Sequence, residues 1–364
     1  MKPSVIAIIA VGILIPFSGV GCLGGAQRGA CGETEPIATI CGFRNPEDLE
    51  YVAGAGVVLV SNMRRGDDGG FISAFQPGDT RVRVLWPAGS TGDISPHSDL
   101  GDESCPGPPN RGAFYPHGLT SRRNGEQTLV YVVAHAGDAG GREAVEIFLL
   151  TGKGKAAALS WAACIPTPSA VQGNDVAAAP DGTLVVANYQ PNDSLANMIS
   201  ANVLGRSTGD IIVWSKDSGW QHLRGSESLM ANGVAVSDDG RMIFYTETGN
   251  GRVHRRPLTG KGPEVHITVP GKPDNLTWDR EGKLLVSTHT SGFRFALCLF
   301  GRSPCDSPWA TYEIDPVTLA KRKVLEHNGR LIGAVATTLQ VGDELYFGSV
   351  FDDRIGVAHV RKQD

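Results

Sequence analysis

One hairpin pattern recurs six times along the chain and sets the strongest limit on its fold. In each copy an apolar residue begins a short alternating run, a turn with glycine follows, and a β-branched or aromatic run returns. Four copies have six residues from the apolar start to the turn glycine, over 119–125, 176–182, 234–240 and 276–282. The other two copies begin at Leu49 and Val335. No window has a long helical period, so the sequence predicts six hairpins of short strands.

Recurrence of one hairpin at intervals of roughly 42 to 70 residues is typical of a repeat architecture. A single hairpin cannot bury its own faces, whereas four-stranded sheets arranged around an axis can. We therefore predict an all-β chain folded as a six-bladed β-propeller. A β-sandwich with coincidental turns is the alternative. The content of glycine and proline, 47 and 22 of 364 residues, fits many strands joined by many turns.

The first 22 residues have the composition of an export signal. Lys2 is followed by an apolar run from Val5 to Phe17, which is shorter than the ~20 residues of a membrane span and fits a secretory signal. The stretch ends at Cys22 in a sequence like a lipobox, in which this cysteine would be lipidated. Ordinary cleavage and a retained anchor are the alternatives. We expect an exported protein, either a membrane-anchored lipoprotein or a periplasmic or secreted one.

The rest of the chain shows no boundary between domains. Residues 23–36 are expected to be a flexible tether, and residues 37–364 to form the propeller. Segment 86–112 is rich in proline, glycine, aspartate and serine, and we interpret it as a loop inserted before the second hairpin. With 33 Lys and Arg against 38 Asp and Glu, the net charge of −5 argues against nucleic acid as the main partner.

Six cysteines remain after Cys22, and an even number in an exported chain predicts disulfides. Cys298 and Cys305 bracket a short loop and are the expected local pair. The pairing of the other cysteines stays open at this stage; they are Cys31, Cys41, Cys105 and Cys164. The chain has no C-x-x-C, which makes a thiolate zinc site unexpected.

Polar residues stand directly before five of the six hairpins, and in a propeller such equivalent positions converge near the central axis. Four carboxylates brought together there would repel strongly without cations. Oxygen ligands of this kind favour a hard cation such as calcium, and four negative charges could balance two divalent ions. We therefore predict a metal-binding tunnel. The leading pairs are Glu47-Asp48, His117-Gly118, Asn174-Asp175, Asn232-Gly233, Asp274-Asn275 and, in the sixth copy, Gly333-Ala334.

The histidines of two hairpins belong to the same face. His117 begins the second hairpin and His135 ends its returning strand, so the two should be neighbours. His289 ends the returning strand of the fifth hairpin and should line the same mouth. We interpret His117 and His135 as catalytic candidates and the remaining histidines as structural. No G-x-S-x-G, H-E-x-x-H or G-x-x-x-x-G-K-[ST] motif occurs, so serine hydrolysis, zinc proteolysis and nucleotide hydrolysis lack their usual signatures.

Seven segments in the same order and spacing resemble the paraoxonase (arylesterase and lactonase) family. That family lies within the calcium-dependent six-bladed propeller hydrolases, together with the senescence-marker/gluconolactonase and strictosidine-synthase-like proteins. The resemblance covers roughly Gly42 to Val360. The segments are Pro46–Glu50, Pro116–Leu119, Val132–His135, Gly173–Val176, Ala231–Val234, Pro273–Leu276 and Ser287–His289.

The resemblance implies two calcium ions, one catalytic and one structural, and a water activated by His117 as general base with His135 orienting it. The catalytic ion would be held by Glu47, Asn174, Asn232, Asp274 and Asn275. The structural ion would be held by Asp48, Asp175 and the backbone carbonyl of Leu119. Tyr189 stands where the family often has another histidine, and together with His289 it is expected to line the substrate site. No cysteine follows Cys305, so the disulfide that closes the ring in animal members cannot be assumed.

The implied function is calcium-dependent hydrolysis of lactones or aryl esters. Its partners would be small-molecule substrates, without nucleic acid, and a membrane only through an N-terminal lipid. One alternative is a gluconolactonase-type sugar-lactone hydrolase with one catalytic metal and no histidine dyad. The other is a non-catalytic calcium-binding propeller that binds a ligand or a partner.

Overall fold

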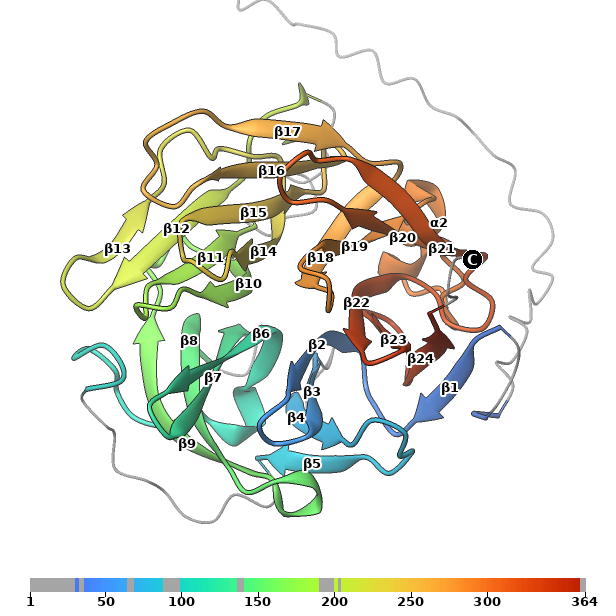
Figure 1. Ribbon diagram of the computed structural model, residues 1–364, viewed down its shortest axis with the longest axis horizontal. Coiled ribbons are helices and arrows are strands. Elements are labelled where there is room, and N and C mark those ends of the chain that lie inside the picture. The colour runs from blue at the N-terminus through green and yellow to red at the C-terminus, as the bar shows by residue number, and fades with distance from the viewer. Residues whose placement is uncertain are drawn as a thin grey trace, which may run out of the picture.

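Six four-stranded sheets stand around a central axis in the part of the chain that the structure describes (Figure 1). The structure is a computed structural model, and it describes residues 30–32, 36–63, 69–87, 99–135, 141–189, 200–201 and 204–360. The predicted all-β, six-bladed β-propeller is therefore confirmed. The predicted signal peptide with Cys22 and most of the predicted tether lie outside the described residues.

Each sheet holds four strands from the axis outward, and its neighbours in that order pair antiparallel. The innermost strands are β2 (Pro46–Val52), β6 (Tyr115–Asn124), β10 (Gly173–Ala178), β14 (Ala231–Val236), β18 (Lys272–Trp278) and β22 (Val335–Val341). The second strands are β3 (Val57–Asn62), β7 (Gln127–His135), β11 (Leu184–Asn188), β15 (Met242–Glu247), β19 (Leu284–His289) and β23 (Glu344–Ser349). The third strands are β4 (Phe71–Phe75), β8 (Ala144–Thr151), β12 (Asp210–Ser215), β16 (Arg252–Pro257), β20 (Trp309–Ile314) and β24 (Arg354–His359). The outermost strands are β5 (Arg83–Trp86), β9 (Ala158–Pro166), β13 (Gly219–His222), β17 (Val265–Thr268), β21 (Lys321–His327) and β1 (Ala38–Cys41).

The six predicted hairpins are the first two strands of the six sheets. Their tight turns need a backbone conformation with positive φ, which glycine adopts without a steric penalty. A glycine with positive φ stands in every one of these turns: Gly56, Gly125, Gly182, Gly240, Gly282 and Gly342. The recurring glycine in the sequence is thus explained by the turn that it makes.

The ring closes through the N-terminal strand. β1 pairs antiparallel with β24, so that Ala38 lies opposite Val357 and Cys41 opposite Arg354. The sixth sheet therefore combines strands from both ends of the described chain (Figure 1). The closure consists of backbone hydrogen bonds and needs no disulfide between the first and last strands.

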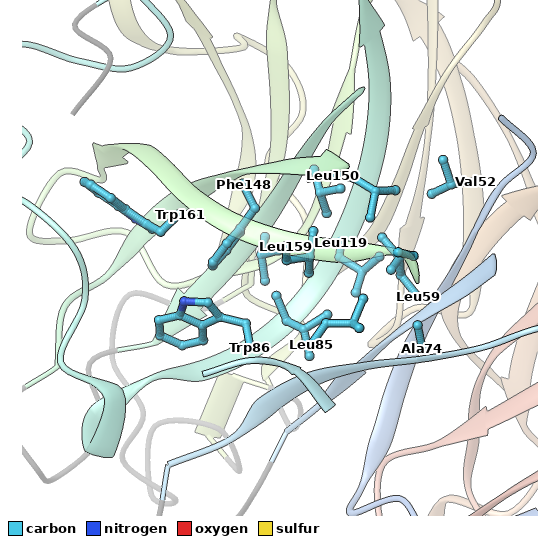
Figure 2. Packing of buried hydrophobic residues seen from close by; sticks show 14 of the residues in the cluster. Val52, Leu59, Ala74, Leu85, Trp86, Leu119, Phe148, Leu150, Leu159 and Trp161 are labelled. Carbon is cyan, nitrogen blue, oxygen red and sulfur yellow. The ribbon is translucent and has the colours of Figure 1, made fainter. Parts of the chain in front are cut away.

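Apolar side chains fill the space between neighbouring sheets. The cluster between the first and second sheets is shown in Figure 2, where Trp86 lies beside Phe148 with ring centroids 5.4 Å apart. Phe114 packs edge-on against the same indole at 4.4 Å. Comparable clusters join each of the other neighbouring pairs. Because every sheet buries both faces against neighbours, the ring holds the starts of its innermost strands in fixed relative positions.

Three disulfides occur in the described part of the chain: two join a loop to an outer strand, and the third joins α2 to the loop that follows it. The expected Cys298–Cys305 pair is confirmed, and the open pairings resolve as Cys31–Cys41 and Cys105–Cys164. Cys105–Cys164 joins the segment before the second sheet to β9. Disulfides of this number are typical of proteins outside the reducing cytosol. They agree with the expected export, which itself stays a prediction.

Short helices occur only between strands in the described ranges. α2 (Gly292–Leu299) follows β19 and is capped by Ser291, whose side chain accepts a hydrogen bond from the backbone N–H of Arg294. Two turns of 3-10 helix are η1 (Arg111–Ala113) and η2 (Gly154–Ala156). The ends of the predicted inserted loop thus belong to β5 and η1. No helix among the described residues is long and apolar enough to cross a membrane.

Candidate metal centre

Each innermost strand begins with a bulge in its pairing to the second strand. In β10 the register shifts between Gly173 and Val176, so that Asn174 and Asp175 leave the regular ladder. A shift of this kind redirects side chains at the end of a strand. The same irregularity occurs at the start of the other five innermost strands. In the first five sheets the bulges hold the polar residues singled out in the sequence.

Two aspartates in these bulges, Asp48 and Asp175, tie neighbouring sheets together in the same way. Each carboxylate accepts one hydrogen bond from the next residue of its own strand and one from the adjacent innermost strand. The donors to Asp48 are the N–H groups of Leu49 and Leu119, at 2.9 and 2.8 Å. The donors to Asp175 are those of Val176 and Val234, at 2.7 and 2.8 Å. The first sheet is thereby joined to the second and the third to the fourth.

Two further hydrogen bonds complete the connection across the axis. Asn275 Nδ2 of the fifth sheet donates to Glu47 Oε1 of the first at 2.8 Å. His117 Nδ1 of the second sheet lies 2.7 Å from the carbonyl oxygen of Asn174 in the third. The bulges of five sheets therefore meet in one volume, and their polar side chains are all buried: Glu47, Asp48, His117, Asn174, Asp175, Asn232, Asp274 and Asn275.

The sixth sheet differs from the prediction in its register. Gly333-Ala334 was expected to stand level with Glu47-Asp48, but the shift in β22 lies between Val335 and Thr337. Val335 therefore occupies the position of Pro46, since both are the last paired residues before the bulge. Thr337 is fully buried, lies close enough to Asp48 to lower the pKa of that carboxyl, and has a hydroxyl oxygen without a hydrogen-bond partner. Thr337 therefore belongs to the candidate site. It was missed in the sequence, because the apolar Val335 resembles a first hairpin residue equivalent to Leu49.

Oxygen atoms without a hydrogen-bond partner identify the part of this volume that suits a cation. The buried atoms of this kind include Glu47 Oε2, Asn174 Oδ1, Asn232 Oδ1 and Asn275 Oδ1. Buried oxygens without partners are costly, and four from four different sheets share no other explanation among the described residues. All are carboxylate or amide oxygens, the donor set that calcium prefers. The residues present therefore fit a hard divalent cation.

The raised pKa values of the carboxyl groups in this volume also favour a bound cation. Burial, together with the charges of Asp48, Asp274 and Asp175, raises the pKa of Glu47 well above its usual value. Burial raises the pKa of Asp48 from 3.8 to about 6 against the hydrogen bonds from Leu119 and Leu49. The pKa of Asp175 is likewise raised well above its usual value, first by burial and then by the charge of Asp48. A bound cation would favour the charged form of each group and offset these shifts.

A pH dependence of stability follows for the metal-free protein. Asp48 ionises at 3.8 when unfolded and at about 6 when folded, so between these values the folded chain binds more protons. The contribution of Asp48 to the free energy of unfolding should fall as pH rises from ~4 to ~6, and the raised pKa values of Glu47 and Asp175 should continue the fall at higher pH. Urea unfolding after dialysis against metal-free buffer measures this slope. Asp48→Asn should make the slope between pH ~4 and ~6 shallower, and an unchanged slope in that variant would contradict the assignment.

Two glycines permit the close approach of neighbouring bulges. Gly118 stands in the second sheet where Asp175 stands in the third. A Cβ atom on Gly118 would lie 2.3 Å from Asp175 Oδ1 and 2.8 Å from the carbonyl oxygen of Asn174. Gly233 is in the same situation in the fourth sheet, with 2.6 Å to the Cα atom of Asn275. The sequence thus alternates a residue with a polar side chain and a glycine around this layer.

Gly118→Ala should therefore damage both stability and metal binding. The methyl group has to displace the Asp175 carboxylate, and overpacking of this kind costs roughly 1–3 kcal/mol. We expect a lower urea midpoint and weaker calcium binding by isothermal titration. Gly54→Ala is the matched control, since a Cβ atom at Gly54 meets nothing within 4 Å. Equal behaviour of the two variants would show that the close approach at Gly118 is unimportant.

The two candidate catalytic histidines lie next to each other. The ring centroids of His117 and His135 are 5.1 Å apart, with the rings inclined at 66°. The carbonyl oxygen of Asn174 can only accept a hydrogen bond, so His117 Nδ1 carries the proton and Nε2 is the basic nitrogen. His135 Nδ1 donates to Glu143 Oε2 at 3.0 Å. Glu143 was not expected from the sequence; its only signal is an acidic residue soon after a histidine that ends a strand.

His289 and Tyr189 border the site from the side. His289 is 2% exposed, and its Nε2 lies 2.7 Å from Asp274 Oδ2, while its ring stacks on Phe295 of α2 at 4.1 Å. His289 therefore fixes the position of the Asp274 carboxylate through this hydrogen bond. Tyr189 packs against the small cluster that contains Leu229, and burial, with the charge of Asp274, raises the pKa of its hydroxyl. Both residues lie near the candidate metal centre, and their contact with a substrate is a proposal.

Comparison with known proteins supports a gluconolactonase-like propeller. Residues 138–296 match the family SGL, the SMP-30/Gluconolactonase/LRE-like region. The matched stretch includes the bulges of the third, fourth and fifth sheets. The strictosidine synthase-like 13 protein of Arabidopsis thaliana is 27% identical over 117 residues, which is 31% of this chain. The match spans 29% of the length of that relative.

Solved structures share the fold at low sequence identity. A gluconolactonase from Xanthomonas campestris is 13% identical, with a TM-score of 0.53 and 89% of each chain covered. Regucalcin from Agrobacterium tumefaciens, described as a calcium-binding protein, is 14% identical with a TM-score of 0.52, covering 89% of this chain and 94% of that one. A virginiamycin B lyase from Staphylococcus aureus reaches 0.50 at 13% identity, covering 89% and 99%. The likeness at this identity shows the fold, and the reaction has to be argued from the site.

Proposed function

We propose that the protein is a calcium-dependent hydrolase of lactones. The observation that carries the proposal is the set of four buried oxygens without partners, which come from four sheets and surround one carboxylate-rich volume. The family match over residues 138–296 and the calcium-binding and gluconolactonase neighbours support the same reading. Hydrolysis of aryl esters at this site belongs to the proposal, since both substrate classes present a carbonyl carbon to water.

Residues of the bulges would hold two calcium ions. The catalytic ion would be held by Glu47, Asn174, Asn232, Asp274 and Asn275. The second, structural ion would be held by Asp48, Asp175 and the carbonyl of Leu119. Bound calcium supplies positive charge that polarises a substrate carbonyl and stabilises the oxyanion formed on it. His289 would act from outside this set, by fixing Asp274.

The histidine pair would move the proton of the attacking water. His117 holds its own Nδ1 proton against the Asn174 carbonyl, which leaves Nε2 to accept a proton. An imidazole is suited to this role because its ordinary pKa lies near neutral pH. His135, adjacent to it, is oriented by Glu143 through Nδ1. The negative charge of Glu143 would stabilise the imidazolium form of the pair once the proton has been taken up.

A gluconolactonase-type sugar-lactone hydrolase is the second candidate, and the family match favours it. That reading needs the metal and its acidic ligands but assigns no role to the histidine dyad. A non-catalytic calcium-binding propeller is the third candidate, and the similar fold of regucalcin, a calcium-binding protein, supports it.

A substrate panel with metal control tests the three readings. Purified protein is assayed with an aliphatic lactone, an aryl ester and gluconolactone, each in calcium and after chelation. Calcium-dependent hydrolysis of the first two supports the leading proposal. Turnover confined to gluconolactone would replace it by the second reading. Calcium binding without any hydrolysis would leave the non-catalytic propeller.

A further inference from the structure

A second group of metal-ligating side chains lies on the outer strands of the fourth sheet, outside the central site. His254 of β16 stands directly opposite His266 of β17, and Glu264 precedes β17. Glu264 Oε1 lies 2.8 Å from His254 Nδ1 and 3.7 Å from His266 Nδ1. The three ligand atoms all lie within 4.8 Å of one another. Ligands of a tetrahedral zinc ion with bonds of ~2.1 Å lie ~3.4 Å apart, so small side-chain movements would admit one ion.

The buried histidine of this group is already oriented for a metal. His254 Nε2 lies 3.1 Å from Glu247 Oε2, and its ring stacks on Tyr245 at 4.6 Å with an interplanar angle of 2°. A carboxylate accepts the Nε2 proton, so Nδ1 is the nitrogen turned toward Glu264. A metal-ligating histidine almost always donates its other N–H to a carboxylate in this manner.

The second oxygen of Glu264 has its own partners. Arg256 NH1 lies 3.8 Å from Glu264 Oε2, and Tyr245 Oη lies 3.5 Å from the same atom. These contacts direct Oε1 toward the two histidines. The group is open on one side, because the His266 side chain is 44% exposed and that of Glu264 28% exposed. An ion can therefore enter from solvent and keep a water molecule as its remaining ligand.

We propose that His254, Glu264 and His266 form a peripheral site for a borderline transition-metal ion such as zinc. Two imidazole nitrogens and one carboxylate oxygen suit zinc, copper or nickel and not calcium, which takes oxygen ligands. The sequence alone marked both histidines as structural, because only the pairing of β16 with β17 places them face to face. The site is independent of the proposed hydrolase function. The chain would thus hold two chemically distinct classes of metal at separate places.

Zinc titration of the full chain with calcium present in excess tests this proposal. Calorimetry should detect one zinc ion per chain under conditions where the central site is saturated with calcium. His266→Ala removes one exposed ligand and should weaken zinc binding at least ~10-fold. Glu264→Gln keeps the shape of its side chain, removes the charge, and should give a second, independent loss. Cobalt in place of zinc should give tetrahedral visible bands that both variants lose.

The matched control is His222→Ala, which removes an exposed histidine from the outermost strand of the third sheet. His222 pairs with the single carboxylate of Asp210, and zinc binding should be unchanged in this variant. The same zinc isotherm in the wild type and in His266→Ala would overturn the proposal. So would zinc binding that survives His266→Ala and disappears as calcium is raised, because it would place the ion in the central site.

Discussion

His117→Gln should lower turnover of a lactone by ~10²–10⁴-fold, the usual contribution of a general base. Glutamine can keep a hydrogen bond to the Asn174 carbonyl through its amide N–H but cannot take a proton at neutral pH. The fold and the calcium content should survive, since none of the proposed metal ligands is altered. Steady-state kinetics together with metal analysis of the same preparation separates a chemical defect from a loss of metal.

His222→Gln is the control for this result, because it makes the same exchange on an outer strand with 64% side-chain exposure. Its kinetics should match those of the wild type. Lactone hydrolysis that persists at the wild-type rate in His117→Gln would remove the histidine from the mechanism. Since the gluconolactonase-type reading assigns no role to the dyad, that outcome would favour it over the leading proposal.

Removal of calcium should abolish activity and lower the melting temperature by on the order of 10 °C. Each ion present at 1,000 times its dissociation constant stabilises the folded chain by ~4 kcal/mol, which corresponds to a shift of this size. The loss is expected because four carboxylates then face one another without a cation. Differential scanning calorimetry in calcium and after chelation measures the shift, and readdition of calcium should restore it.

Asp175→Asn separates the two proposed ions. The substitution removes a proposed ligand of the structural ion and leaves the proposed ligands of the catalytic ion unchanged. The variant should therefore bind one calcium ion per chain in place of two. Its melting temperature should fall, because the aspartate also joins the third and fourth sheets through Val176 and Val234. If the melting temperature of the wild-type protein is the same before and after chelation, both proposed calcium sites are contradicted.

The hairpins were predictable because their turns leave a local signature. A glycine with positive φ between two short apolar runs specifies both strands, as at Gly182 and Gly240. Closure by β1 was not predictable, because Ala38 and Val357 lie more than three hundred residues apart and neither carries a distinguishing pattern. The pairing of Cys105 with Cys164 was open for the same reason: four cysteines allow three connectivities.

The polar residues of the candidate metal centre were predictable where they share a register with the repeat. Thr337 was not, because the bulge of β22 lies later than the apolar Val335 indicates. Glu143 was not, because its contact with His135 depends on how the chain returns after β7. The outer group around His254 needed the pairing of two strands in three dimensions. The sequence repeat therefore predicted the polar residues near the axis. Contacts that occur in a single sheet could be found only in the structure.

The pairing of β1 with β24 determines when the ring can close during synthesis. Residues 38–41 are translated more than three hundred residues before their partners at 354–357. Until then β1 has no ladder to join and the edge of the growing ring stays unpaired, which invites association between chains. Slow, late ring closure would therefore be the step at which this protein most needs a chaperone.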